Sequence, residues 1–100
     1  MKRIGYWRRT KDSTENLPWP EEGHLPQDIK ELIFRHLMGG TITSHWMGWS
    51  TCRVCGKMNG SVCMTDGEFE YPEGYAHYIL DHNIQPDSEL LSKVLSFTLL

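Results

Sequence analysis

Two cysteines and two histidines in the second half of the chain have the types and the spacing of metal ligands. Cys52 and Cys55 form a C-x2-C pair followed by Gly56. This spacing lets two thiolates approach one ion from a tight turn, which glycine permits. His77 and His82 form an H-x4-H pair, within the three to five intervening residues typical of zinc fingers. The predicted ligands of a Zn²⁺ ion are therefore Cys52, Cys55, His77 and His82.

The two pairs raise a geometric difficulty. In a straight helix, five residue steps place His77 and His82 about 140° apart around the axis and about 7.5 Å apart along it. The conflict is removed if the last helical turn loosens, and Asn83, which tolerates the left-handed conformation, favours such an ending. Asp81, four residues after His77, is either an exposed helix carboxylate or the outer partner that fixes the tautomer of that imidazole.

Two other side chains compete as ligands. Cys63 falls in a predicted strand, which favours a small buried hydrophobic residue, although coordination stays an alternative. His45 lies near the first cysteine and is the weaker competitor. Three cysteines is an odd number, which argues against a disulfide framework. Without a metal, the same pattern describes two buried cysteines and two surface histidines.

The chain of 100 residues is expected to form one α+β domain. We expect a small antiparallel sheet with a zinc knuckle, hairpin and helix, flanked by N- and C-terminal helices. Because such a small domain has a limited core, the metal would add stability. The predicted parts are a basic arm and loop (1–25), a helix (26–40), a zinc-binding module (41–85) and a C-terminal helix (86–100).

Within the module, residues 41–51 are predicted to be extended, with a bulge or bend at Gly48. A hairpin turn is expected at Asp66-Gly67, because Asp-Gly between strand-like segments favours that turn. Pro72 and Glu73 are expected to open a helix that runs to about residue 83. Trp46 and Trp49 belong either to the core or to an aromatic binding surface around the knuckle.

Charge is distributed unevenly along the chain. Five of the ten basic residues precede the first acidic one, and the rest of the chain carries five basic and 13 acidic side chains. A basic arm of this kind contacts phosphate or is a solvated terminus. The candidate nucleic-acid contacts are Lys2, Arg3, Arg8, Arg9 and Lys11.

The segments CRVCGKMNG and MTDGEFEYPEGYAHY, with the later His82 and an early GYW, carry a resemblance. The chain is similar to Cys2His2-type zinc fingers and, more narrowly, to a group of small bacterial and phage-type proteins. Those proteins share the motifs C-R-x-C-G, T-D-G and W-P-E-G-x-A-H-Y. Here Tyr71 replaces the tryptophan, and Cys63 stands where the group tends to have another residue. The resemblance covers roughly residues 51–82 and 5–7, supports the same four ligands and implies no activity.

Three function classes remain. A closed four-ligand site predicts a structural metal in a non-catalytic module that binds another protein. Nucleic-acid binding through the arm is the alternative, but the helix expected from Pro72 onward has no basic residue for base contacts. Enzyme activity would require that His82 does not bind the metal, so that a coordination position stays open for water. No catalytic signature motif in the sequence supports this alternative. The sequence suggests no small-molecule substrate. Without a membrane-length apolar run or signal peptide, we expect the cytoplasm.

Overall fold

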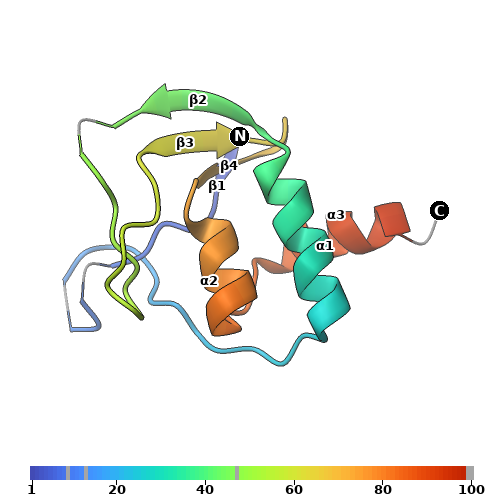
Figure 1. The fold of residues 1–100 in the computed structure, drawn as a ribbon, viewed down its shortest axis with the longest axis horizontal. Helices are drawn as coiled ribbons and strands as arrows, with labels where there is room; N and C mark the ends of the chain where they lie inside the picture. The colour runs from blue at the N-terminus through green and yellow to red at the C-terminus, as the bar shows by residue number, and fades with distance from the viewer. Residues whose placement is uncertain (9, 13, 47, 99–100) are drawn as a thin grey trace.

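The computed structural model describes residues 1–8, 10–12, 14–46 and 48–98 of the chain, with the side chain of residue 98 left out. Helices and strands occur in the order expected of an α+β fold, which confirms the predicted class (Figure 1). The elements are β1 (Lys2–Arg3), α1 (Gln27–Met38), β2 (Thr41–His45), β3 (Val62–Thr65), β4 (Phe69–Pro72), α2 (Tyr75–His82) and α3 (Ser88–Thr98).

Helix α1 confirms the predicted N-terminal helix. Pro26 precedes its first turn, where the missing N–H costs nothing. Its apolar stripe faces the core, and Ile33 and Leu37 have no exposed surface. The helix ends at Gly39, whose N–H donates to the Arg35 carbonyl at 3.0 Å, and the N–H of Gly40 donates to the Leu37 carbonyl at 3.2 Å.

The sheet has the order β1-β4-β3-β2. Strands β3 and β4 form the predicted antiparallel hairpin around Asp66-Gly67. The sheet is mixed rather than purely antiparallel, because β1 pairs with β4 in parallel. The chain enters along this edge and continues into the core, where the N–H of Ile4 donates to the Glu70 carbonyl at 2.9 Å and its side chain is buried.

The bulge lies elsewhere than predicted. The register between β2 and β3 shifts between Ile42 and Ser44, inside the edge strand, where bulges commonly occur. Gly48 is exposed beyond the end of β2, and a Cβ there would meet nothing within 4 Å. The alternative of a bulge at Gly48 is therefore wrong, since β2 has already ended at His45, but the alternative of a bend there is confirmed.

Helix α2 begins later than predicted. Pro72 is the last residue of β4 and is paired with Cys63, so it closes the hairpin instead of opening the helix. The Glu73 carboxylate accepts the N–H of Ser61 at 3.0 Å, which fixes the turn between strand and helix. The helix then starts at Tyr75.

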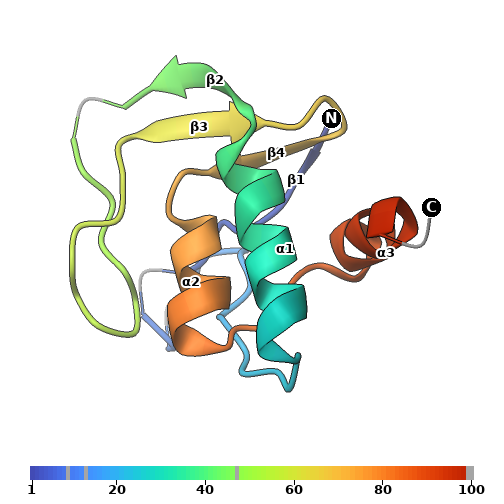
Figure 2. The ribbon, with the colours of Figure 1, turned by 45° about the vertical axis from the view of Figure 1, so that its right-hand side comes forward.

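Helices α1 and α2 lie side by side, and α3 extends beside α1 (Figure 2). The first and last helices of the chain are therefore in contact. The main core lies between these helices and the sheet, and Leu90 and Val94 bring α3 into it. Gly5 permits a close approach, because a Cβ there would lie 2.5 Å from Cγ of Tyr75 and its φ is +77°.

Asp66 joins the hairpin turn to two helices. Its carboxylate lies 2.7 Å from Nε2 of His36 in α1 and 2.9 Å from Nζ of Lys93 in α3. Burial opposes its ionisation, but the N–H of Phe69, the His36 ring and the other donors outweigh burial and hold the pKa of Asp66 well below its usual value. The turn carboxylate thus ties α1 and α3 to one end of the sheet.

Candidate metal centre

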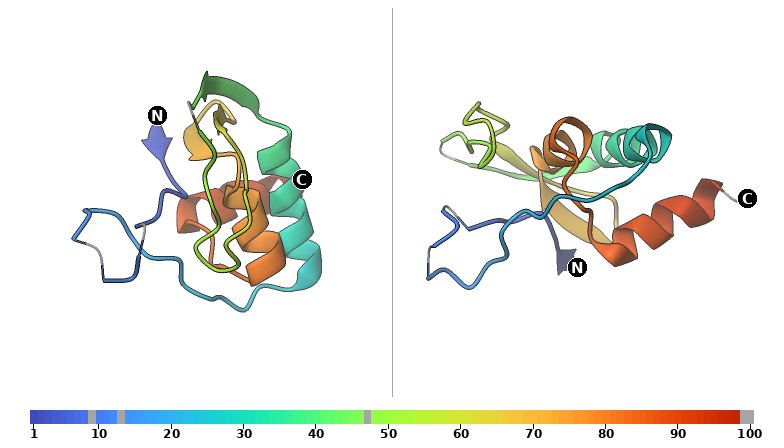
Figure 3. Two further views of the ribbon diagram at one scale, coloured as in Figure 1. Left: turned by 60° about the vertical axis from the view of Figure 1, so that its left-hand side comes forward. Right: turned by 90° about the horizontal axis from the view of Figure 1, so that it is seen from below.

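The segment from Trp46 to Ser61, here called the excursion, leaves the sheet between β2 and β3 and returns to it. It runs down beside α2 as an irregular hairpin (Figure 3). At its base, the N–H of Trp46 donates to the Ser61 carbonyl at 2.7 Å. Near its tip, Thr51 and Met58 form an isolated bridge. The C-x2-C pair therefore lies at the far end of the excursion, away from the sheet.

Backbone hydrogen bonds shape the tip around the two cysteines. The N–H of Gly56 donates to the Cys52 carbonyl at 2.9 Å, and the N–H of Cys52 donates to the Lys57 carbonyl at 2.8 Å. Gly56 has a φ of 74°, which the predicted tight turn requires and glycine adopts without strain. Cys52 is buried, whereas Cys55 is exposed.

The end of α2 resolves the difficulty with the two histidines. The N–H of Ile84 reaches back six residues to the carbonyl of Tyr78, at 3.1 Å. This is wider than a regular α-helical turn, in which the bond spans four residues. Asn83 is left-handed, with φ 56° and ψ 27°. The predicted loosening of the last turn is thus confirmed.

The ligand atoms of Cys52, Cys55, His77 and His82 all lie within 4.8 Å of one another. Sγ of Cys55 lies 3.5 Å from Nε2 of His77, and the Nε2 atoms of His77 and His82 are 3.2 Å apart. Zinc bonds of about 2.3 Å to sulfur and about 2.0–2.1 Å to nitrogen, set at the tetrahedral angle, separate a sulfur and a nitrogen ligand by about 3.6 Å and two nitrogen ligands by about 3.4 Å. These two separations are close to the tetrahedral values, so this group could bind a metal.

Asp81 lies where the sequence predicted a partner for His77. Its Oδ2 is 2.8 Å from Nδ1 of His77, four residues earlier on α2. If Nδ1 carries the proton and donates it to the carboxylate, Nε2 keeps a free lone pair directed at Cys55 and His82. The contact thus favours the tautomer that a metal needs.

The exposed thiol of Cys55 ionises easily. The backbone N–H of Lys57 and then the His77 ring stabilise its thiolate and lower the pKa of Cys55 to about 6. Thiolates, not thiols, bind metals, so at neutral pH this sulfur is already in the form that coordinates.

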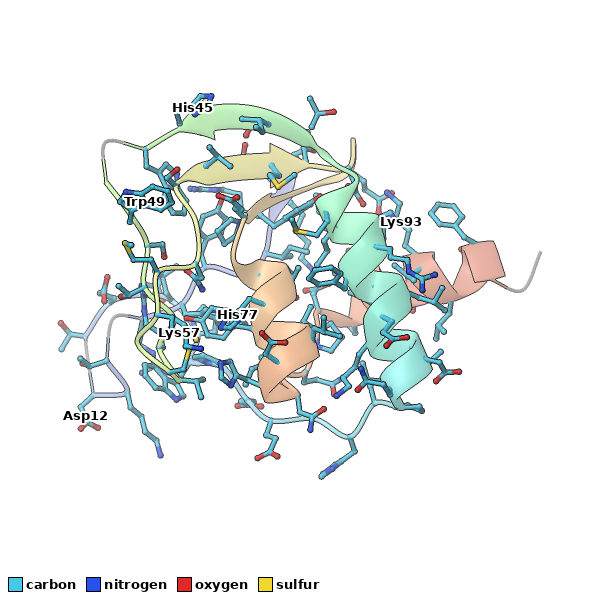
Figure 4. All side chains as sticks on the ribbon, in the orientation of Figure 1. Asp12, His45, Trp49, Lys57, His77 and Lys93 are labelled. Carbon is cyan, nitrogen blue, oxygen red and sulfur yellow. The ribbon has the colours of Figure 1, made fainter. Side chains whose placement is uncertain are left out.

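The competing ligands lie outside this group. Cys63 is buried in β3, as predicted, but its sulfur also has polar neighbours. It shares a hydrogen bond with the Tyr6 hydroxyl and accepts one from Nε1 of Trp46, each at 3.1 Å. These neighbours are distant in sequence, and no local pattern announces them. His45 is exposed at the end of β2, at the sheet end of the excursion and away from His77 (Figure 4).

Arg53, between the two cysteines, fastens the tip to the rest of the protein. Its N–H donates to the Tyr78 hydroxyl at 2.6 Å. Its guanidinium donates to the main-chain oxygens of Arg8 at 3.0 Å and Thr51 at 2.6 Å. Nothing in the sequence pointed to this structural role of Arg53, because both Tyr78 and the arm are far away along the chain.

Two basic residues of the N-terminal arm form ion pairs with acidic residues of the same chain. Lys2 lies 3.1 Å from Asp87 and 3.2 Å from Glu89, and Arg3 lies 3.2 Å from Glu70. The other three predicted nucleic-acid contacts differ in their surroundings. The Arg8 guanidinium donates to the Lys11 carbonyl at 3.3 Å, and Lys11 itself is exposed. Arg9 lies outside the described residues.

No protein-family model, curated protein or solved structure matches the chain. The resemblance to zinc fingers therefore stays a prediction from the sequence. Among the described residues, no helix has both the length and the apolar character needed to cross a membrane.

Proposed function

We propose that this protein is a small zinc-binding module whose metal is structural. The observation that carries the proposal is the group of two cysteines and two histidines whose ligand atoms all lie within 4.8 Å of one another. Two thiolates and two imidazoles form a donor set typical of structural zinc and poorly suited to hard cations such as Mg²⁺. Four protein ligands leave no open position for water, which supports a role without catalysis.

In this proposal the ion joins three segments. Cys52 and Cys55 come from the excursion tip, and His77 and His82 come from α2. Arg53 connects the same tip to the N-terminal arm. The metal thus fixes a surface built from parts that are distant in sequence. We propose that this surface binds another protein in the cytoplasm, where cysteines stay reduced and available to a metal.

Protein binding is favoured over nucleic-acid binding by the ion pairs of the arm. Lys2 and Arg3 contact acidic side chains of this chain, so phosphate would have to displace them. Helix α2 carries Asp81 and has no Lys or Arg.

Metal analysis of the purified protein tests the proposal. We expect about one equivalent of zinc in the wild type and in Cys63→Ser, because Cys63 lies outside the group. Cys52→Ser should lose most of the metal. Less than half an equivalent in the wild type, or equal zinc in Cys52→Ser and the wild type, would overturn the metal assignment.

A further inference from the structure

The excursion differs in charge from the rest of the protein. Its only charged residues are Arg53 and Lys57, whereas the rest of the chain has eight Lys and Arg residues against 13 Asp and Glu. Two thiolates would balance the charge of a bound Zn²⁺, so the loaded excursion stays positive. It is therefore a cationic part of an acidic protein.

Arg53 is a fixed cation without an acidic partner. Lys2, Arg3 and Lys93 each contact a carboxylate of this chain. The guanidinium of Arg53 instead binds main-chain oxygens, and no carboxylate among the described residues lies within ion-pair distance of it. Its side chain is thus positioned while its charge stays available to a partner.

A cavity of about 620 Å³ lies beside this guanidinium. Its walls come from the arm, the excursion and α2, and they include Tyr6, Trp7, Trp46, Trp49 and Tyr78. Such a volume suits one or two large side chains of a ligand.

Contacts within the protein hold some of these rings in place. Tyr6 and Trp46 both direct their polar ends to the sulfur of Cys63. Their rings are therefore fixed before a ligand arrives, which lowers the entropic cost of binding. Glu15, the acidic residue among the described lining residues, already has an interaction of its own.

Large apolar side chains on the excursion are exposed beside these cations. Trp49 is 65% exposed, Val54 53% and Met58 67%. Figure 4 shows Trp49 in the part of the excursion nearer the sheet and Lys57 toward its tip, near α2. Tryptophan, methionine and arginine are enriched at the centres of protein interfaces, whereas nucleic-acid surfaces carry many more cations.

We infer that the cavity and the excursion bind an acidic peptide segment of a partner protein through one large apolar anchor. The anchor enters between the aromatic rings, and a neighbouring carboxylate pairs with Arg53. This inference rests on the proposed function, because the metal-held tip supplies one wall of the cavity. Charge complementarity selects the partner: the cations of the excursion attract an acidic segment that the rest of the protein repels.

Fluorescence anisotropy with labelled pentapeptides tests the inference. The probe has a central tryptophan flanked by two glutamates on each side. One control peptide replaces the glutamates by lysines, and the other replaces the tryptophan by alanine. We expect the zinc-loaded protein to bind the probe at least about tenfold more tightly than either control peptide. Equal binding of the three peptides would overturn the inference.

Variants locate the binding on the surface. Arg53→Gln and Trp49→Ala should each lower the affinity for the probe peptide at least about fivefold. Arg35→Gln removes an exposed cation of α1 instead and should leave the affinity unchanged. Because Arg53 also supports the arm, the exposed Trp49 provides the variant that leaves the fold intact. Equal losses in Arg35→Gln and Arg53→Gln, or no loss in Trp49→Ala, would contradict the assignment.

Two further measurements separate the possible failures. The first is the binding of a short oligothymidylate. If it binds more tightly than the probe and its affinity falls with added salt, the ligand of this surface is single-stranded nucleic acid and the peptide inference is wrong. Zinc is measured in every sample. A protein that holds one equivalent of zinc but does not bind the probe refutes only the peptide inference, whereas a protein without zinc refutes the proposed function.

Discussion

Replacing Asp81 tests whether the predicted outer partner of His77 supports metal binding. In the structure, Oδ2 of Asp81 lies 2.8 Å from Nδ1 of His77. Asp81→Ala removes this acceptor, so His77 loses the contact that favours a free Nε2 lone pair. The Asp81 side chain is 57% exposed, and such a surface ion pair contributes at most about 1 kcal/mol to folding. The variant should therefore fold and show its main defect in metal affinity.

The expected size of the defect follows from the role of such partners in metal sites. Removing the carboxylate that orients a histidine ligand typically costs 10–100-fold in affinity, or about 1.4–2.8 kcal/mol. Asp81→Asn keeps an oxygen that accepts the Nδ1 proton but loses the negative charge, so its loss should be at most about tenfold. Glu31→Gln removes an exposed helix carboxylate on α1, outside the metal group, and serves as the matched control.

Competitive titration against a chromophoric zinc chelator at pH 7 measures these affinities. We expect the wild type and Glu31→Gln to bind equally, Asp81→Asn to bind less tightly and Asp81→Ala to bind least tightly. An unchanged affinity of Asp81→Ala would refute the reasoning. So would an equal loss in Glu31→Gln, because the effect would then come from net charge rather than from the contact with His77.

Three other changes test the fold around the site. Asp66→Asn should lower the free energy of unfolding at neutral pH by about 3 kcal/mol in urea titrations. Because folding depresses the pKa of Asp66, its contribution is present above about pH 4 and is lost as the pH falls, so the difference from the wild type should shrink in acid. Gly5→Ala should cost about 2–4 kcal/mol in the same assay, since its Cβ would overlap Tyr75. Removing zinc with a chelator should speed hydrogen exchange in the excursion while the amides of β3 and β4 stay protected; equal exchange with and without the chelator would count against a metal that holds the tip.

Local patterns predicted the metal group well, because ligand spacing and turn chemistry are local properties. The C-x2-C-G motif defines its own turn, and Gly56 adopts the positive φ expected there. The histidine pair needed a loosened helix end, and Asn83 is the local signal that provides it. The four side chains were therefore identifiable as a group before their distances were known.

The elements that long-range contacts decide were harder to predict. Pro72 looked like the first residue of a helix, but its pairing with Cys63 keeps it in the sheet. The role of Arg53 depends on Tyr78 and on the carbonyls of the arm, which nothing in its neighbourhood reveals.

The division of the core explains where a metal would act. The main cluster of buried residues lies between the helices and the sheet and contains none of the four ligands. Cys52 belongs to a second, small cluster with Tyr78 and Ile84. This small cluster has little apolar area to stabilise the tip, since burial contributes only about 25 cal/mol per Å². The stabilising effect of a bound ion would therefore fall mainly on the excursion and, through Arg53, on the arm. These segments form the aromatic cavity, so metal loading and partner binding should rise and fall together while the helices and the hairpin stay folded.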